Sequence, residues 1–253
     1  MNTRPATDAC IVCHGSFSPY PIGDKDGYRF VSCRSCGSVL ADPWPTDEAL
    51  EKYYGDIQPQ AVHAQNPQAE IDTAAKILGK TLPQPAAGKN RLLDINAQRG
   101  YAVVAAQKLG WKATGLNAQE FLHLFAVANY GEQNFIHSDV ISYAAQSREK
   151  YDVIITASAF TEARDLDAFT AALTTLLAPG GVIFIEEPDG NHFNTPRDFA
   201  GWAMVEPPVT CATLSKKGLT KLLARHGLGF KKIFFTWLRP FVRGLAAPVA
   251  RKK

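Results

Sequence analysis

Short apolar runs and stretches of helical spacing alternate along the chain from residue 91 onward. The run at 92–95 has the length of a buried strand, and residues 96–100 have turn chemistry. Residues 101–109 are Ala-rich with apolar side chains at helical spacing, and 112–116 form a second short run. Strand, loop, helix and strand in this order predict a βαβ unit with parallel strands. Open α/β sheets bind ligands at such a loop, because it lies at the carboxyl end of a strand and amide N–H groups point into it.

The same alternation continues to residue 237. We expect helices at 118–129, 166–177 and 216–226, and strands at 134–137, 151–156, 178–186 and 229–237. The sequence therefore predicts an α/β fold with a Rossmann-like, doubly wound and mostly parallel sheet. Residues 187–213 show neither periodicity, and a loop of that length in a compact domain is usually functional or disordered.

Four of the five cysteines form two Cys-x-x-Cys pairs separated by 19 residues. Each pair can present two thiolates on one side of a tight turn, and two pairs complete a tetrahedral site. A closed set of four soft thiolates fits structural Zn²⁺, whereas a redox role would explain only one pair. Gly15 and Gly37 suit the turns, and His14 is expected outside the ligand shell. The sequence thus predicts a zinc ribbon with the ligands Cys10, Cys13, Cys33 and Cys36.

Composition divides the chain into four expected segments. Residues 1–45 are the zinc-ribbon module, and 46–90 are a helical lid and linker that begins with Thr46 as a helix cap. Residues 91–238 are the Rossmann-like domain, and 239–253 are a basic tail without a continuous amphipathic helix.

Charge and hydropathy limit the location and the partners that we expect for this protein. No apolar run reaches the ~18 residues of a transmembrane helix, and the first residues lack a secretory apolar segment. We therefore expect a cytoplasmic protein, in which paired cysteines bind metal. Residues 207–253 carry 11 Lys or Arg and no Asp or Glu, whereas the other residues carry 16 basic and 24 acidic side chains. This asymmetry favours an anionic partner, with at most peripheral membrane contact, but a solvated basic end explains it equally well.

The stretch 91–117 resembles the first motif of class I S-adenosylmethionine (SAM)-dependent methyltransferases, which reads Asp-x-Gly-x-Gly-x-Gly after a strand. Asp94 and Gly100 match the motif, and Asn96 and Gln98 stand where its first two glycines belong. Asn tolerates positive φ, so Asn96 is compatible with the turn. The resemblance implies that Asp94, Asn96 and Gly100 contact the cofactor.

Two further positions follow from the same resemblance. Asn117 stands where an acidic residue binds the ribose, and it can still hydrogen-bond ribose hydroxyls without charge assistance. Asp139 matches an Asp that accepts from the adenine amino group, and it also suits the N-cap of the next helix. The Pro-Gly-Gly turn that opens the strand at 178–186 also matches the family.

Residues 33–54 resemble the zinc-ribbon segment that precedes many bacterial small-molecule methyltransferases. In those proteins a Tyr-bearing helix closes over the SAM site, which implies this role for Tyr53 and Tyr54, although ordinary packing explains them equally. Family members follow the fourth strand with a Glu-His pair, of which Glu162 is present while Ala163 takes the His position.

Two functions stay open on these residues. The resemblance implies a SAM-dependent methyltransferase that acts on a small-molecule, sugar or lipid acceptor, with Glu187 and His192 as candidate acid/base groups. The alternative is a catalytically inactive pseudo-methyltransferase that serves as a binding or partner subunit, which the missing glycines and histidine favour. Glu187 and His192 also suit ordinary polar loop positions. We do not expect nucleic acid as a partner, because the basic end lacks interleaved aromatic residues.

Overall fold

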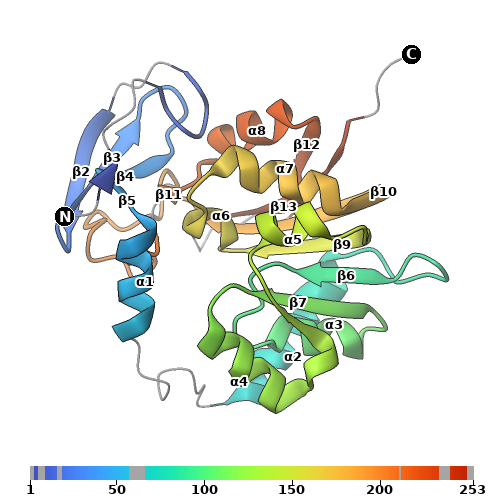
Figure 1. Ribbon diagram of the computed structural model, residues 1–253. Coiled ribbons are helices and arrows are strands. Elements are labelled where there is room, and N and C mark those ends of the chain that lie inside the picture. The colour runs from blue at the N-terminus through green and yellow to red at the C-terminus, as the bar shows by residue number, and fades with distance from the viewer. Residues whose placement is uncertain are drawn as a thin grey trace. The chain divides into compact units, whose positions relative to one another are not determined.

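The computed structural model describes residues 3–4, 9–15, 19–56, 66–210, 212–233 and 240–249 (Figure 1). The chain divides into two compact units. Unit 1 comprises Met1–Asp56, Ala157–Thr170 and Ile185–Lys253, and unit 2 comprises Ile57–Thr156 and Ala171–Phe184. The main sheet has seven strands in the order β12 (Leu228–Lys232), β13 (Phe241–Pro248), β10 (Leu177–Pro188), β9 (Tyr151–Ala157), β6 (Arg91–Asp94), β7 (Lys112–Asn117) and β8 (Phe135–His137).

Unit 2 contains the predicted βαβ unit. β6, helix α3 (Tyr101–Lys108) and β7 follow one another, and the two strands are parallel with Leu92 opposite Ala113. β6 pairs in parallel with β9 on its other side, and β7 pairs in parallel with β8. Leu92 and Leu93 are fully buried, as expected of a central strand covered on both faces. The predicted parallel pairing is confirmed.

Helices connect the strands of unit 2. Helix α2 begins after Asn66, whose side chain accepts a hydrogen bond from the Ala69 N–H at 3.1 Å, and Pro67 occupies its first turn. The helical elements are α2 (Pro67–Thr81), α4 (Glu120–Tyr130), the 3₁₀ helix η2 (Glu132–Asn134), α5 (Val140–Gln146) and α7 (Leu166–Leu176), whose first residues belong to unit 1.

Unit 1 contains an antiparallel sheet built on the ribbon. Its order is β11 (Ala212–Thr213), β4 (Val39–Asp42), β3 (Tyr28–Cys33) and β2 (Pro19–Lys25), and a separate pair joins β1 (Thr3–Arg4) to β5 (Trp44–Pro45). The Thr46 hydroxyl accepts from the Ala49 N–H at 3.3 Å, which confirms the predicted cap. The helices of this unit are α1 (Asp47–Asp56), α6 (Ala159–Glu162) and α8 (Lys216–Arg225).

The segment predicted as a long loop packs on the ribbon. It supplies β11, which pairs with β4, and it buries Phe199 and Trp202 in one cluster with Phe30 of β3. The Phe30 and Phe199 ring centroids are 5.4 Å apart. The four expected segments are therefore not four modules, because the ribbon and residues 185–253 share unit 1. Helix α1 of the expected lid and linker lies in unit 1, whereas α2 lies in unit 2.

The residues expected as a basic tail contain the seventh strand, which corrects that prediction. β13 pairs antiparallel with β12, and its alternating pattern buries Val242 and Ala246. A Cβ on Gly244 would lie 2.5 Å from the Lys231 carbonyl and 2.6 Å from the Phe230 ring, so this position requires glycine. Small residues on the buried face, flanked by prolines and arginines, hid the strand periodicity in the sequence.

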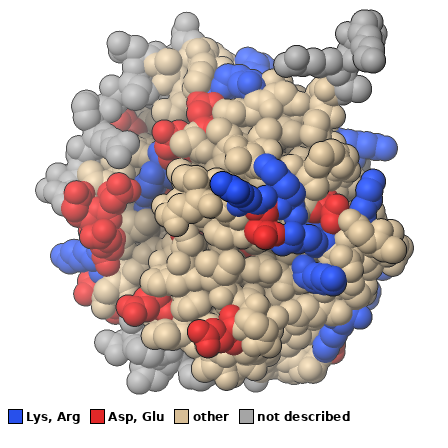
Figure 2. Space-filling model, turned by 45° about the vertical axis from the view of Figure 1, so that its right-hand side comes forward, with Lys and Arg blue, Asp and Glu red and all other residues tan. Residues whose placement is uncertain are grey.

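Basic side chains of the C-terminal end are partly paired. Figure 2 shows Lys and Arg side chains on one face with Asp and Glu side chains among them. Arg225 pairs with Asp167, and Arg243 pairs with Glu186. Within the described parts of the chain, no helix combines the length and apolar character needed to cross a bilayer.

Candidate functional site

Asp94 ends β6 and is 3% exposed. Burial raises the pKa of its carboxyl to about 7, and the hydrogen bond from the backbone N–H of Asn96 opposes that rise. The carboxyl therefore takes up its proton near neutral pH and orients the first residue of the loop. Asp94 thus lies at the carboxyl end of β6, directly before the loop.

The loop after Asp94 is held by backbone hydrogen bonds. The Ala97 N–H donates to the Leu116 carbonyl at 2.9 Å, and the Gly100 N–H donates to the Ala97 carbonyl at 2.7 Å. Positive φ angles occur at Gln98 (46°) and Gly100 (84°), and Asn96 is not among the residues with positive φ. A Cβ on Gly100 would lie 2.6 Å from the Phe135 ring, which explains the one glycine retained there.

Asn117 ends β7 with no exposed surface. Its Nδ2 donates to the Gln98 carbonyl at 3.0 Å, which ties the strand to the loop. Its Oδ1 is buried without a hydrogen-bond partner, as are Asn96 Nδ2 and Tyr101 OH. Buried polar atoms are nearly always paired in native proteins, so this set is one that a polar ligand would satisfy. The sequence motif indicated the two asparagines, whereas Tyr101 was missed because nothing in its sequence context distinguishes it from a core aromatic.

Asp139 is exposed at the N-terminus of α5. Its Oδ1 accepts from the N–H groups of Ile141 and Ser142, each at 2.9 Å, so the predicted capping role is confirmed. Partial burial raises the pKa of this carboxyl, but hydrogen bonds from Ser142 outweigh burial and the net pKa is lowered. An ionised carboxylate is therefore present at the carboxyl end of β8.

The two candidate acid/base groups lie in different settings. Glu187, near the end of β10, has no exposed surface, and its Oε1 accepts from the Phe160 N–H at 3.2 Å. Its Oε2 is buried without a partner, and burial raises the pKa of this carboxyl well above its usual range. His192 is half-buried, and its Nδ1 accepts from the Asn194 N–H at 3.1 Å within the same turn. No hydrogen bond joins Glu187 to His192 in the part of the chain described.

A group of titratable side chains, which we call the α1 polar cluster, lies in unit 1 and comprises Tyr53, Tyr54, Glu162, Arg164 and Glu206. Tyr53 donates to Glu206 Oε1, and burial with this bond raises the pKa of Tyr53 to about 12. Burial and then Glu162 raise the pKa of Tyr54. Perturbed titratable groups gather at functional sites more often than elsewhere.

Arg164 and Glu206 are the members of this cluster that sequence reasoning missed, and Arg164 has the unpaired donors. Its Nη2 donates to the Pro208 carbonyl at 2.8 Å, while Nε and Nη1 are buried without a partner. Burial lowers the pKa of the guanidinium, and the nearby charge of Asp47 opposes the shift. An isolated arginine between two helices carries no sequence signal, so only the fold reveals these unpaired donors.

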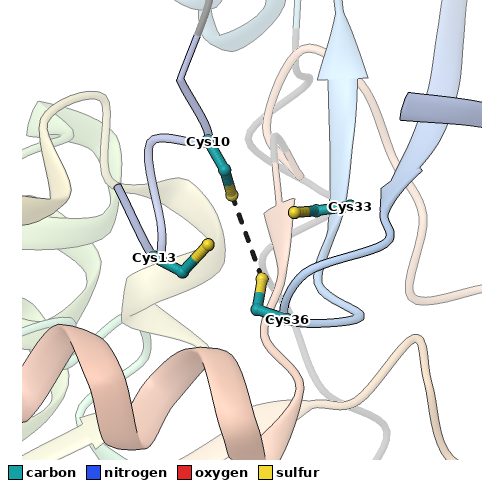
Figure 3. Close-up of side chains that lie close together, drawn as sticks. All are labelled: Cys10, Cys13, Cys33 and Cys36. Atoms are coloured by element: carbon teal, nitrogen blue, oxygen red, sulfur yellow. Dashed lines mark hydrogen bonds between the residues drawn. The ribbon is translucent and has the colours of Figure 1, made fainter. Parts of the chain in front are cut away.

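The four predicted cysteines converge on one point (Figure 3). Their sulfur atoms all lie within 4.8 Å of one another, and Cys10 Sγ is 3.9 Å from Cys36 Sγ. That hydrogen bond raises the pKa of Cys10 and lowers the pKa of Cys36 to about 5, so one thiolate forms readily. His14 Nε2 lies 2.7 Å from Asp167 Oδ2, and this contact holds the imidazole outside the sulfur cluster. The arrangement can hold one tetrahedral metal ion.

Comparisons with known proteins agree with this fold. The family model described as a methyltransferase domain matches residues 63–231. A comparison with curated protein sequences finds no match.

Solved structures share the architecture, and two of the three described here are named as methyltransferases. A TehB-like SAM-dependent methyltransferase from Corynebacterium glutamicum has a TM-score of 0.51 and 17% identity over 70% of this chain and 87% of that one. Magnesium protoporphyrin IX methyltransferase from Synechocystis, solved with bound S-adenosylhomocysteine (SAH), has a TM-score of 0.53 and 18% identity over 80% and 94%. Streptomyces venezuelae DesVI has a TM-score of 0.54 and 16% identity over 81% and 100%.

At these identities the structural likeness shows the fold alone, and the family rests on the matched model, which spans more than half of the chain. The chain belongs to the methyltransferase-domain family.

Proposed function

We propose that the protein is a SAM-dependent methyltransferase that acts on a small-molecule acceptor. The observation that carries this proposal is the pair of unpaired buried atoms, Asn96 Nδ2 and Asn117 Oδ1, after adjacent parallel strands of a methyltransferase fold. SAM, when bound, supplies a methyl group activated by a sulfonium centre. The residues present fit such a ligand, because it offers both donors and acceptors.

Each loop residue has a role in this proposal. Asn117 Oδ1 accepts from a ribose hydroxyl, while its Nδ2 keeps Gln98 in place. Asn96 Nδ2 donates to the methionine carboxylate, and Gly100 lets the backbone turn tightly. Asp94 orients the Asn96 amide, and Asp139 accepts from the adenine amino group with the carboxylate oxygen that does not cap α5.

The acceptor is assigned to unit 1. The unpaired Arg164 Nε and Nη1 can donate to acceptor oxygens, and Tyr53 and Tyr54 frame the same cluster. Glu187 is the candidate general base for the substrate. Its raised pKa keeps the carboxyl protonated at pH values where an ordinary glutamate is ionised, so Glu187 must first lose its own proton before it can take one from the substrate. His192 is the second candidate and would need to release the Asn194 N–H. An acceptor that needs no deprotonation requires neither group.

We assign the four-cysteine cluster to structural Zn²⁺. Four thiolates at these separations fit tetrahedral zinc, and a closed set of sulfur ligands has no open position for catalysis. Cys10, Cys13, Cys33 and Cys36 would hold the metal, which organises the ribbon rather than the reaction.

The inactive-subunit alternative rests on the same loop. Asn117 lacks the charge of an acid and Asn96 carries a side chain where the motif has glycine, so cofactor binding is the decisive property. Isothermal titration with SAM and SAH tests it, with Asn96→Ala as the variant and Asn129→Ala as its control, because Asn129 is exposed on α4.

We expect micromolar binding of SAM or SAH, weakened about tenfold by Asn96→Ala for a charge-assisted hydrogen bond, and unchanged by Asn129→Ala. No binding at millimolar ligand by a folded protein would favour the inactive subunit.

A further inference from the structure

Helix α8 contacts both Cys-x-x-Cys turns, one with each of its ends. At its N-terminus the Ser215 hydroxyl donates to the Cys36 carbonyl at 2.5 Å. The Ser215 N–H donates to Ser38 Oγ at 3.2 Å, and its hydroxyl also accepts from the Gly218 N–H at 2.9 Å. One residue therefore caps α8 and holds the second cysteine pair.

The other end of α8 holds the first cysteine pair. Arg225 Nη1 donates to the Val12 carbonyl at 2.7 Å. Arg225 Nη2 also lies 2.9 Å from Asp167 Oδ1. Asp167 in turn contacts His14 at 2.7 Å and His226 at 2.8 Å, so it fixes the arginine and the residue that follows Cys13.

The first turn of α8 lies close to the ribbon. A Cβ on Gly218 would overlap Ser38 Oγ and lie 3.0 Å from Val12 Cγ1, so the helix approaches both turns as closely as glycine allows. The helix buries Leu219, Leu222 and Leu223 together with Gly218, and β12 follows the helix directly.

We propose that α8 is a brace that sets the separation of the two cysteine pairs, so that metal binding and the folding of residues 212–232 are coupled. The proposal rests on the metal site assigned above. Ser215 and Arg225 are positioning residues, since each acts on the sulfur ligands through a backbone carbonyl of the ribbon. Coupling of this kind is reciprocal: whatever α8 contributes to metal affinity, the metal contributes to the stability of α8.

The inference couples the metal to α8, a helix within the matched methyltransferase domain, rather than to a detachable module. Loss of the metal frees both turns, and α8 then loses the two carbonyl contacts that end it. The strand pair β11–β4 and the edge strand β12 are the next elements affected, because they adjoin the ribbon and α8.

The first test follows zinc transfer from the purified full-length protein to a chromophoric chelator, after zinc content has been measured. Ser215→Asp keeps an oxygen to cap α8 but cannot donate to Cys36, and Arg225→Ala removes the bond to Val12. Each is expected to weaken zinc binding about five- to tenfold, as for one lost hydrogen bond. Thr220→Ala is the control, because Thr220 is exposed and bonds only within the helix.

The second test compares amide hydrogen exchange in the zinc-loaded and chelator-treated protein. We expect residues 216–225 to lose protection on metal removal while α2 keeps it. Equal protection of α8 in both states, or wild-type zinc transfer in both variants, would overturn the brace while leaving the metal site intact. A protein that contains and binds no zinc would overturn the metal assignment, and the brace with it.

Discussion

Replacing Asn117 by Asp tests whether the loop after β6 depends on the hydrogen bond that the Asn117 amide donates to it. The change restores the acidic residue of the family motif, so motif matching alone predicts tighter cofactor binding. The structure predicts the reverse, because Asn117 Nδ2 donates to the Gln98 carbonyl at 3.0 Å and a carboxylate cannot. An Asp at this fully buried position would turn an oxygen toward that carbonyl.

The magnitude follows from two costs. A buried acceptor left without its donor costs about 1–3 kcal/mol, and desolvation of the new carboxylate adds to it. We therefore expect Asn117→Asp to lower the free energy of unfolding by about 2 kcal/mol or more at pH 7.5, which corresponds to about 4–8 °C in Tm for a chain of this length. SAM binding should weaken as well, because the loop is no longer held.

The sign of the pH dependence provides an internal check. Burial should raise the folded pKa of the new carboxyl above its unfolded value, so the penalty is largest at high pH and shrinks as the pH falls through the folded pKa. A protonated Asp can also donate its O–H to the Gln98 carbonyl. Urea unfolding of wild type and variant at pH 7.5 and pH 5.5 measures this difference, with Asn129→Asp as an exposed control. Unchanged stability together with tighter SAM binding would refute the reasoning.

Four further outcomes are expected. Gln98→Gly should raise the free energy of unfolding in urea by about 1 kcal/mol, because glycine adopts the positive φ of 46° without strain. A lower free energy of unfolding would show that the Gln98 side chain stabilises the folded protein. The pKa of the Asp94 carboxyl is raised to about 7 in the folded protein, so its contribution to stability is present below about pH 4 and is lost as the pH rises to about 7. Asp94→Asn should therefore remove this decline in the free energy of unfolding between about pH 4 and pH 7. The same decline in the variant would show that another group titrates. Metal analysis should find about one zinc per chain, and a folded, metal-free protein would contradict it. Ending the chain at residue 240 should prevent stable folding by removing β13, whereas ending it at 249 should not, as measured by circular dichroism and thermal melts.

Local patterns identify the elements that depend on neighbours in sequence. The run at 92–95 and the helical spacing after Gly100 predict the βαβ unit, because buried parallel strands are apolar throughout and capped helices are periodic. The cysteine spacing predicts four converging sulfur atoms for the same reason. Each of these features lies within a few residues or in a repeated short motif.

Elements that depend on distant partners carry little local signal. The inward positions of β13 include the small residues Gly244 and Ala246, and the Phe230 ring and the Lys231 carbonyl show why a small residue is needed at Gly244. β11 is two residues long and exists through its pairing with β4, more than 170 residues earlier in the chain. Arg164 gains its unpaired donors from burial alone.

The two departures from the motif at the site also could not be interpreted from local sequence alone. When each position is compared separately with the family motif, Gln98 and Asn117 each indicate the loss of a cofactor contact. In the structure they are partners: Gln98 adopts a left-handed conformation that costs a non-glycine residue about 1–2 kcal/mol, and the Asn117 amide bonds to the carbonyl of that same residue. An ionised acid at 117 could not make this bond, so the Asn117 amide is what ties the end of β7 to the loop. The loop is therefore tied to the end of β7, where the Oδ1 of Asn117 lies buried without a hydrogen-bond partner.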